Sequence, residues 1–187
     1  MTTAFGLTSM DFRGVISQQF VRNFLPLPAL SKFRVGQTLL DFELPVVGQR
    51  APIKLSNYRH KAVVVIAFTR IFTAKQYCPF CYPHILSMVE TYKKFEQLGA
   101  EVLMITSTDM RQSKIIQRDL GLTMPLLVDP SCGSFRQYGT GQALGAPLPA
   151  QFVVDQSGKL AFQHLFSFAH TNASSERLLW AVRNVSR

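Results

Sequence analysis

The sequence predicts an α/β protein with a central mixed sheet and helices on both faces of that sheet. Two continuous apolar runs, at residues 62–68 and 101–106, are typical of strands that are buried on both sides. Segments with helical spacing follow both runs, and a hairpin with Gly in its turn precedes a final amphipathic helix. This order of elements favours parallel strands joined through helices, with the hairpin added at one edge.

Length and composition limit the class of protein. A chain of 187 residues can bury a core that needs neither disulfide bonds nor a structural metal. Its formal net charge of +9 is spread along the chain without a Lys/Arg run, so we expect no specific nucleic-acid partner. The first residues lack a signal-peptide pattern, and no apolar run is long enough to cross a bilayer. We therefore expect a cytoplasmic protein.

The first 35 residues differ from the rest of the chain. Apolar residues at helical spacing predict an amphipathic helix over residues 11–24, and Pro26 and Pro28 end it. We divide the chain into an N-terminal extension, residues 1–35, and a main domain, residues 36–187. The extension either packs on the main domain or, because it is rich in basic residues, docks the protein on an acidic complex or a membrane surface.

The main domain is predicted to alternate strands and helices. After the strand at 62–68 come a helix from the cysteine stretch to Leu98, a strand at 101–106, a helix at 112–120, a strand at 124–129, a hairpin at 152–155 and 160–164, and a helix at 174–185.

Cys78 and Cys81 lie between the first buried strand and the helix that follows it. We expect Cys78 at the helix N-terminus, where the free N–H groups and the helix dipole favour a thiolate. Cys81, one turn inside, would remain a thiol, and Pro79 fits the first turn because its missing N–H has no partner to lose there. Cys78 would attack a disulfide or a peroxide, and Cys81 would release the product by forming a Cys78–Cys81 disulfide.

The sequence around these cysteines resembles the thioredoxin-fold redoxin group, which includes thiol-disulfide reductases and peroxiredoxins of the AhpC/TSA type. The matching segments are Gly36–Leu44, Ile53–Lys61, Cys78–Cys81, Ile105–Asp109 and Pro149–Gly158. The resemblance implies a thioredoxin-like fold and a cis Leu148–Pro149 peptide bond that faces the cysteines. It implies no bound cofactor.

The sequence also departs from the family pattern. Peroxiredoxins carry P-x-x-x-T-x-x-C, but Ile71 and Lys75 stand at the Pro and Thr positions here, with Thr73 nearby. The strand at 62–68 has no acidic residue, and residues 70–76 lengthen the loop before the cysteines. The chain therefore resembles the peroxiredoxin-like branch that keeps the CxxC pair.

A zinc site is the main chemical alternative for the cysteines. Cys78, Cys81 and His84 would give three ligands, with His60 or Cys132 as the fourth. Because there is no second CxxC or paired His motif, we favour redox chemistry and expect no metal.

Four further residues are supporting candidates or stay open. His84, on the first turn of the helix, would raise the local positive field and aid proton transfer, or it is a surface histidine. Arg70 would stabilise a thiolate, or it is a solvated loop residue. Thr73 is a substitute for the missing threonine. Cys132 is a structural thiol or a second resolving cysteine.

We predict a thiol-disulfide oxidoreductase that uses a Cys78/Cys81 dithiol–disulfide cycle, with Pro149 beside the cysteines. The first alternative is a peroxiredoxin-like antioxidant peroxidase that reduces hydrogen or alkyl peroxides, with Cys78 as peroxidatic and Cys81 as resolving cysteine. Either cycle needs a thiol electron donor such as a thioredoxin or glutathione system. A further alternative is a redox-fold docking protein that residues 1–35 recruit to an acidic complex or a membrane.

Overall fold

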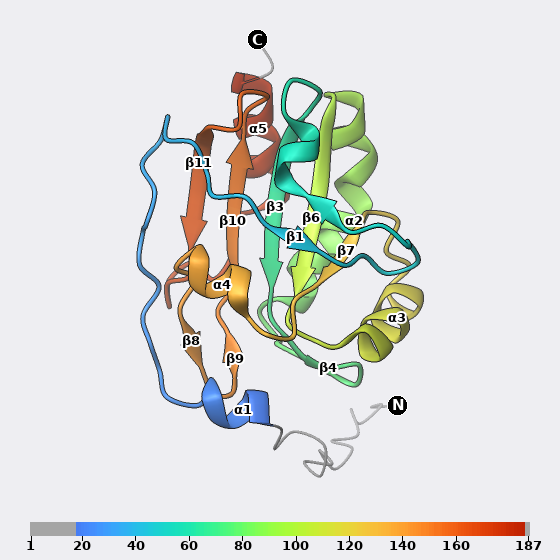
Figure 1. Ribbon diagram of the computed structural model, residues 1–187, viewed down its shortest axis with the longest axis vertical. Helices are drawn as coiled ribbons and strands as arrows, with labels where there is room; N and C mark the ends of the chain where they lie inside the picture. The colour runs from blue at the N-terminus through green and yellow to red at the C-terminus, as the bar shows by residue number, and fades with distance from the viewer. Residues whose placement is uncertain (1–17, 186–187) are drawn as a thin grey trace, which may run out of the picture.

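A five-stranded mixed sheet forms the centre of the computed structural model, which describes residues 18–185 (Figure 1). Its strands are β3 (Val63–Thr69), β6 (Ala100–Thr106), β7 (Leu126–Val128), β10 (Ala150–Val154) and β11 (Leu160–Leu165). They lie in the order β11-β10-β3-β6-β7. β3, β6 and β7 are parallel, while β10 is antiparallel to both β3 and β11. The predicted mixed α/β sheet is confirmed.

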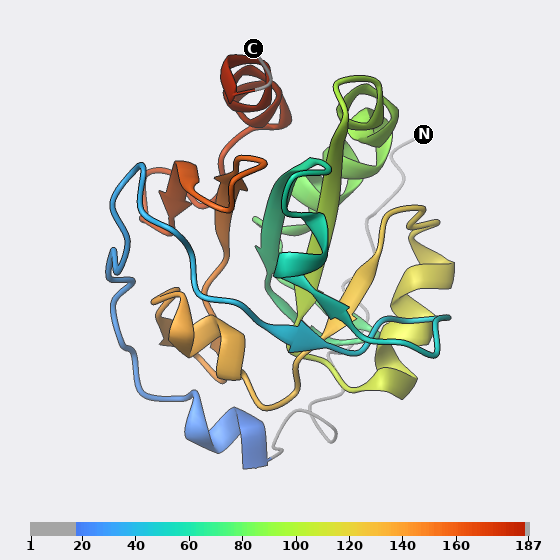
Figure 2. The same ribbon diagram turned by 45° about the horizontal axis from the view of Figure 1, so that its top comes forward.

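Helices cover both faces of the sheet (Figure 2). On one face, α2 (Tyr82–Gln97), α3 (Met110–Asp119) and α5 (Ser175–Val185) pack in one hydrophobic cluster. On the other face, α4 (Gly133–Gln137) and the chain around β1 (Glu43–Leu44) and β2 (Ile53–Lys54) form a second cluster. Because successive side chains of a strand point to opposite faces, β3 contributes to both clusters. All seven of its residues are buried, as its apolar run predicts.

Several short elements escaped the sequence prediction. They are the 3-10 helix Leu55–Tyr58 and the hairpins β4 (Ile71–Thr73) with β5 (Gln76–Tyr77) and β8 (Gln142–Ala143) with β9 (Ala146–Pro147). The β4–β5 hairpin occupies the segment that was expected to be a loop, residues 70–76. Strands of two or three residues are too short to show a period-two pattern, so the sequence gives no signal for them.

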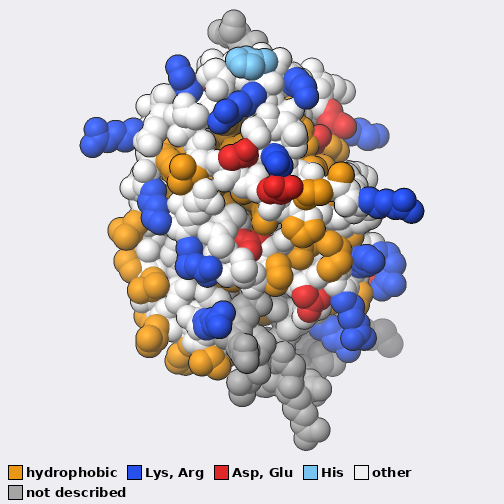
Figure 3. All heavy atoms as spheres, in the orientation of Figure 1, with side chains coloured by type: hydrophobic (Ala, Val, Ile, Leu, Met, Phe, Trp, Pro, Cys, Tyr) orange, Lys and Arg blue, Asp and Glu red, His pale blue; other side chains and the backbone are white. Residues whose placement is uncertain are grey.

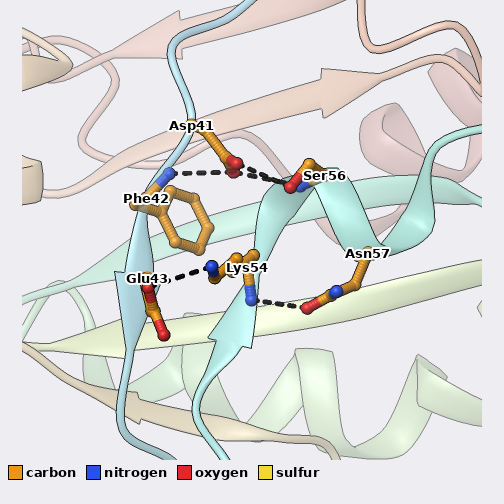
Figure 4. A network of polar contacts seen from close by, with 6 residues as sticks. All are labelled: Asp41, Phe42, Glu43, Lys54, Ser56 and Asn57. Atoms are coloured by element: carbon orange, nitrogen blue, oxygen red, sulfur yellow. Dashed lines mark hydrogen bonds and ion pairs between the residues drawn. The ribbon is translucent and has the colours of Figure 1, made fainter.

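A carboxylate fixes the segment that leads into β3 (Figure 4). Asp41 accepts hydrogen bonds from the Phe42 N–H at 3.0 Å and from the Ser56 N–H and hydroxyl at 3.0 and 2.6 Å. Burial acts to raise the pKa of Asp41, but these hydrogen bonds outweigh it and the pKa is lowered. Lys54 and Glu43, directly opposite each other on β2 and β1, form an ion pair at 3.2 Å. The β1–β2 hairpin is therefore joined to the turn before β3.

The N-terminal extension is described from residue 18 onward, so the part of its predicted helix before that residue lies outside the described chain. The helix α1 (Gln18–Arg22) ends two residues before the predicted end at Phe24. Beyond it, Leu27 and Gln142 exchange backbone hydrogen bonds of 2.8 and 2.9 Å. Gly141, at φ +77°, lies so close that a Cβ there would be 2.6 Å from the Leu27 carbonyl oxygen. Within residues 18–185, no helix has both the length and the apolar character needed to cross a membrane.

Candidate active site

The cysteine pair lies between the β4–β5 hairpin and helix α2. Both follow the C-terminal end of β3, the central strand of the sheet. Cys81 is the N-cap of α2, and Cys78 precedes it by one turn. The N–H groups of Cys81 and Tyr82 both donate to the Cys78 carbonyl oxygen at 3.0 Å, so a helical turn joins the two cysteines. The helix thus begins one turn later than predicted. Its first turn contains Pro83 instead of Pro79, and Pro83 fits there because its missing N–H would have no partner in the helix.

The two thiols have very different acidities. A hydrogen bond from the Cys81 side chain is the main cause that lowers the pKa of Cys78 to about 6, and backbone hydrogen bonds and the Arg70 charge add to it against the effect of burial. The same bond, together with burial, raises the pKa of Cys81 well above its ordinary value. Cys78 is 8% exposed and Cys81 1%. Both thiols are thus buried, and Cys78 is the slightly more exposed of the two.

Arg70 brings a buried positive charge to the cysteines. It follows β3 directly and is only 7% exposed. Its Nη2 donates to the Ala143 carbonyl oxygen at 2.5 Å, and the guanidinium carbon lies 4.9 Å from the centre of the Phe72 ring. Burial lowers the pKa of Arg70, and the charges of Cys78 and Cys81 act in the opposite direction. Since an arginine stays protonated in proteins, the guanidinium is a buried cation whose charge acts to lower the pKa of Cys78.

Two polar residues that the sequence analysis missed connect the cysteine turn to the sheet. Asn172 donates from Nδ2 to the Phe80 carbonyl oxygen at 3.2 Å, and its side chain also hydrogen-bonds Cys81, which acts to lower the pKa of that thiol. Gln151, fully buried on β10, donates to Asn172 Oδ1 and accepts from the Ala173 N–H, both at 2.8 Å. The sequence offered one signal for these residues: Gln151 is a polar residue in a strand otherwise made of Ala, Phe and Val, and a buried glutamine needs hydrogen-bond partners.

Pro149 is buried at the same end of β3, immediately before Ala150, which lies opposite Phe68. The prediction of a cis Leu148–Pro149 bond is wrong, because none of the described peptide bonds is cis. The Leu148 N–H donates to the Gly141 carbonyl oxygen at 3.0 Å. The chain can therefore run from β9 into β10 with the trans bond, which is the lower-energy isomer of an X–Pro bond.

Two supporting candidates have roles different from those expected. Burial lowers the pKa of His84 to about 4, against a hydrogen bond with the Ala173 backbone. The imidazole is therefore neutral at pH 7 and does not raise the positive field at the cysteines, which corrects that prediction. Thr73 lies on β4, where its hydroxyl oxygen accepts the Lys75 N–H at 3.2 Å. This contact stabilises the tight turn of the β4–β5 hairpin.

The partly buried His84 leads to a prediction about acid stability. Its folded pKa lies below the unfolded value of about 6.5, so the unfolded state binds the proton first and stability falls as the pH drops from about 6.5 to about 4. The shift corresponds to about 3 kcal/mol at most. In urea unfolding at pH 7 and pH 4, we expect His84→Gln to lose less stability on acidification than the wild type. His170→Gln, at an exposed position, is the control, and an equal loss in all three proteins would contradict the prediction.

The zinc ligands considered from the sequence are not brought together. Within residues 18–185, no three His, Cys, Asp or Glu side chains are placed to hold a metal ion. Cys132 is the N-cap of α4 and belongs to the cluster on the other face of the sheet, where its Sγ lies 3.7 Å from the Asn23 amide. His60 is exposed before β3.

Sequence comparison relates this chain to known thiol redox proteins. The AhpC/TSA family model matches residues 35–163. Peroxiredoxin 2 of Thermoplasma acidophilum is 30% identical over 129 residues, which are 65% of this chain and 61% of that protein. The thiol-disulfide oxidoreductase ResA of Bacillus anthracis is 28% identical over 89 residues, which are 46% of this chain and 48% of ResA. The chain therefore matches less than two thirds of the length of either relative.

Solved structures share the fold. AhpC of Enterococcus faecalis superposes with a TM-score of 0.69 and 21% identity, covering 82% of this chain and 95% of its own. A putative thiol:disulfide interchange protein DsbE from Chlorobium tepidum gives a TM-score of 0.63 and 23% identity over 81% of this chain and 99% of its own. The predicted thioredoxin-like fold is thus confirmed. Since the family model covers more than half of the sequence, the protein belongs to the AhpC/TSA family.

Proposed function

We propose that the protein is a peroxiredoxin-like thiol peroxidase in which Cys78 is the peroxidatic and Cys81 the resolving cysteine. The observation that carries the proposal is the Cys78 thiolate, with a pKa of about 6, next to the Cys81 thiol and the Arg70 guanidinium. The sequence placed disulfide exchange first and peroxide reduction second. We reverse that order because the similar curated proteins are mostly peroxiredoxins and because a buried cation suits a reaction that releases an oxyanion.

The first step breaks the peroxide bond. The Cys78 thiolate attacks one peroxide oxygen, so that an S–O bond forms as the O–O bond breaks. The other oxygen leaves with the electron pair and takes a proton from solvent, which gives water or an alcohol and a sulfenic acid on Cys78. Arg70 stabilises the negative charge that develops on the leaving oxygen.

The second step closes the disulfide. Cys81 attacks the sulfenic sulfur, the S–S bond forms, and the hydroxyl leaves as water with the Cys81 proton. The main cause that raises the pKa of Cys81 is its bond to Cys78, and that cause disappears once Cys78 is uncharged. Cys81 therefore becomes reactive only after the peroxide has reacted, and the Asn172 side chain helps to stabilise its thiolate. A thiol donor such as a thioredoxin or glutathione system then restores both thiols.

Disulfide exchange with a protein substrate is the second candidate function. Phe80, between the two cysteines, is 73% exposed and offers an apolar contact beside Cys78 to an incoming peptide. The similarity to the thiol-disulfide oxidoreductase ResA also supports disulfide exchange. In this reaction the Cys78 thiolate attacks a substrate disulfide, and Cys81 releases the reduced substrate by closing the same Cys78–Cys81 bond.

A side-by-side assay separates the two functions. The reduced protein is mixed with hydrogen peroxide or cumene hydroperoxide, and separately with insulin, under the same supply of dithiothreitol. We expect peroxide to be consumed at least about 1,000-fold faster than by Cys78→Ser, with little reduction of insulin. Cys132→Ser, which removes a thiol outside the pair, is the control. Rapid insulin reduction with no peroxide consumption would overturn the proposal in favour of disulfide exchange.

A further inference from the structure

The N-terminal extension presents large apolar side chains to solvent. Figure 3 shows hydrophobic side chains gathered at the lower left edge of the molecule, over the segment that Figure 1 draws in blue, with Lys and Arg nearby. Their exposed fractions run from 51% at Phe24 to 71% at Leu25. We call this set the N-terminal apolar surface, and it consists of Val21, Phe24, Leu25, Leu27, Leu30 and the neighbouring Leu144.

The segment is held in place by its backbone rather than by these side chains. The Gly145 N–H donates to the Asn23 carbonyl oxygen at 3.1 Å, and the Leu30 N–H donates to the Gly139 carbonyl oxygen at 2.8 Å. The Gln142 side chain adds bonds of 3.1 Å to two further carbonyl oxygens of the extension, those of Arg22 and Leu25.

This anchoring leaves more than half of each of these apolar side chains exposed, although Phe24 also contacts the Phe20 ring, with the ring centres 5.7 Å apart. A segment that only covered the core would turn them inward, as the same segment does with Phe33, which is 5% exposed. Clustered exposed apolar residues on a stable backbone mark an interaction surface.

The charges around this surface point to an anionic partner. Residues 18–40 include Arg22, Lys32 and Arg34 and contain no Asp or Glu, and all three basic residues are exposed. A second copy of the chain fits poorly, because a two-fold interface would place these cations opposite one another without acidic groups to pair with. Lys32 donates to the Arg136 carbonyl oxygen at 2.6 Å, and none of the three basic residues forms an ion pair within the described chain. Apolar side chains beside such basic residues are instead the arrangement that inserts at the boundary of an anionic lipid layer.

We propose that the N-terminal apolar surface docks the protein on an anionic membrane surface. The Phe and Leu side chains enter the boundary between headgroups and acyl chains, while the basic residues contact lipid phosphates. The chain as a whole has a formal net charge of +9, and this charge adds a weaker long-range attraction to the anionic surface. The docking is independent of the peroxidase reaction, since none of its residues belongs to the cysteine site.

Vesicle flotation of the full-length protein tests the proposal. We expect binding to phosphatidylglycerol vesicles at low and at physiological salt, and little binding to vesicles of phosphatidylcholine alone. Replacing Phe24 and Leu25 together by Glu should weaken binding at least about tenfold, because each loses apolar insertion and gains repulsion. The matched control is Phe168→Glu, which changes a side chain that is 98% exposed in the loop before α5. Circular dichroism and thermal melting check that each variant is folded.

Four results would overturn the proposal. The first is no flotation of the wild type, and the second is equal weakening by Phe168→Glu, which would show a charge effect without a defined surface. The third is a dimer, seen by size exclusion without vesicles, that the Phe24/Leu25 double variant dissociates. That result would assign the surface to a second copy of the chain. Binding to immobilised polyglutamate but not to vesicles would likewise count against a lipid partner.

Discussion

Cys78→Ser should abolish peroxide consumption, with a loss of at least about 1,000-fold relative to the wild type. A serine hydroxyl is not ionised near neutral pH, whereas the Cys78 thiol, with a pKa of about 6, is mostly thiolate at pH 7. The measurement is the initial rate of hydrogen peroxide loss with dithiothreitol as reductant. Cys132→Ser should keep the wild-type rate, since that thiol lies in the core cluster on the other face of the sheet.

The pH dependence gives an independent check of the same assignment. The reactive form is the thiolate, so the rate of alkylation of Cys78 by iodoacetamide should rise with pH and level off above a midpoint near 6. A midpoint at the free-thiol value of about 8.5, or peroxide turnover that survives in Cys78→Ser, would refute the role of Cys78 as nucleophile.

Cys81→Ala should have two separate consequences. The pKa of Cys78 should rise from about 6 toward the free-thiol value of about 8.5, because the main hydrogen bond that lowers it is lost. After one equivalent of peroxide without dithiothreitol, Cys78 should remain a sulfenic acid that dimedone labels, whereas the wild type should form the Cys78–Cys81 disulfide. The measurements are an alkylation titration and mass spectrometry after a single addition of peroxide.

Cys81→Ser separates these consequences. Its hydroxyl can still donate to the Cys78 thiolate, so we expect the pKa of Cys78 to rise less than in Cys81→Ala. It cannot form the disulfide, so without dithiothreitol the sulfenic acid should persist in the same way. A disulfide of Cys78 in both variants would show that another thiol of the protein resolves it, and the buried Cys132 would then be tested by a double substitution.

The sequence by itself determined the sheet and the position of the cysteine pair. The run at 62–68 is apolar at every position, short and rich in β-branched residues, which is typical of a strand in a sheet that is covered on both faces. The CxxC motif directly after that strand and before a periodic helix is a local pattern, so its placement at a strand-to-helix junction was readable. The family motifs, which are also local, correctly indicated the AhpC/TSA family.

Only the tertiary structure decided what surrounds the sulfurs. Arg70 reaches its place through a carbonyl 73 positions away in sequence, and Asn172 contacts the cysteine turn across 92 positions. Such contacts depend on how the β8–β9 hairpin and the loop before α5 pack, which no periodic pattern encodes. The trans bond at Pro149 likewise depends on the path from β9 to β10 rather than on the residue type.

Burial explains why the predictions for His84 and for the N-terminal extension differ from the structure. His84 looked like a possible source of positive charge, but packing removes its hydration and keeps it neutral at pH 7. The helical spacing of the extension predicted an apolar stripe but not the side to which it turns. Of that stripe, Phe20 and Phe24 lie within the described residues, where the Phe20 ring packs against Gly145 while Phe24 is 51% exposed.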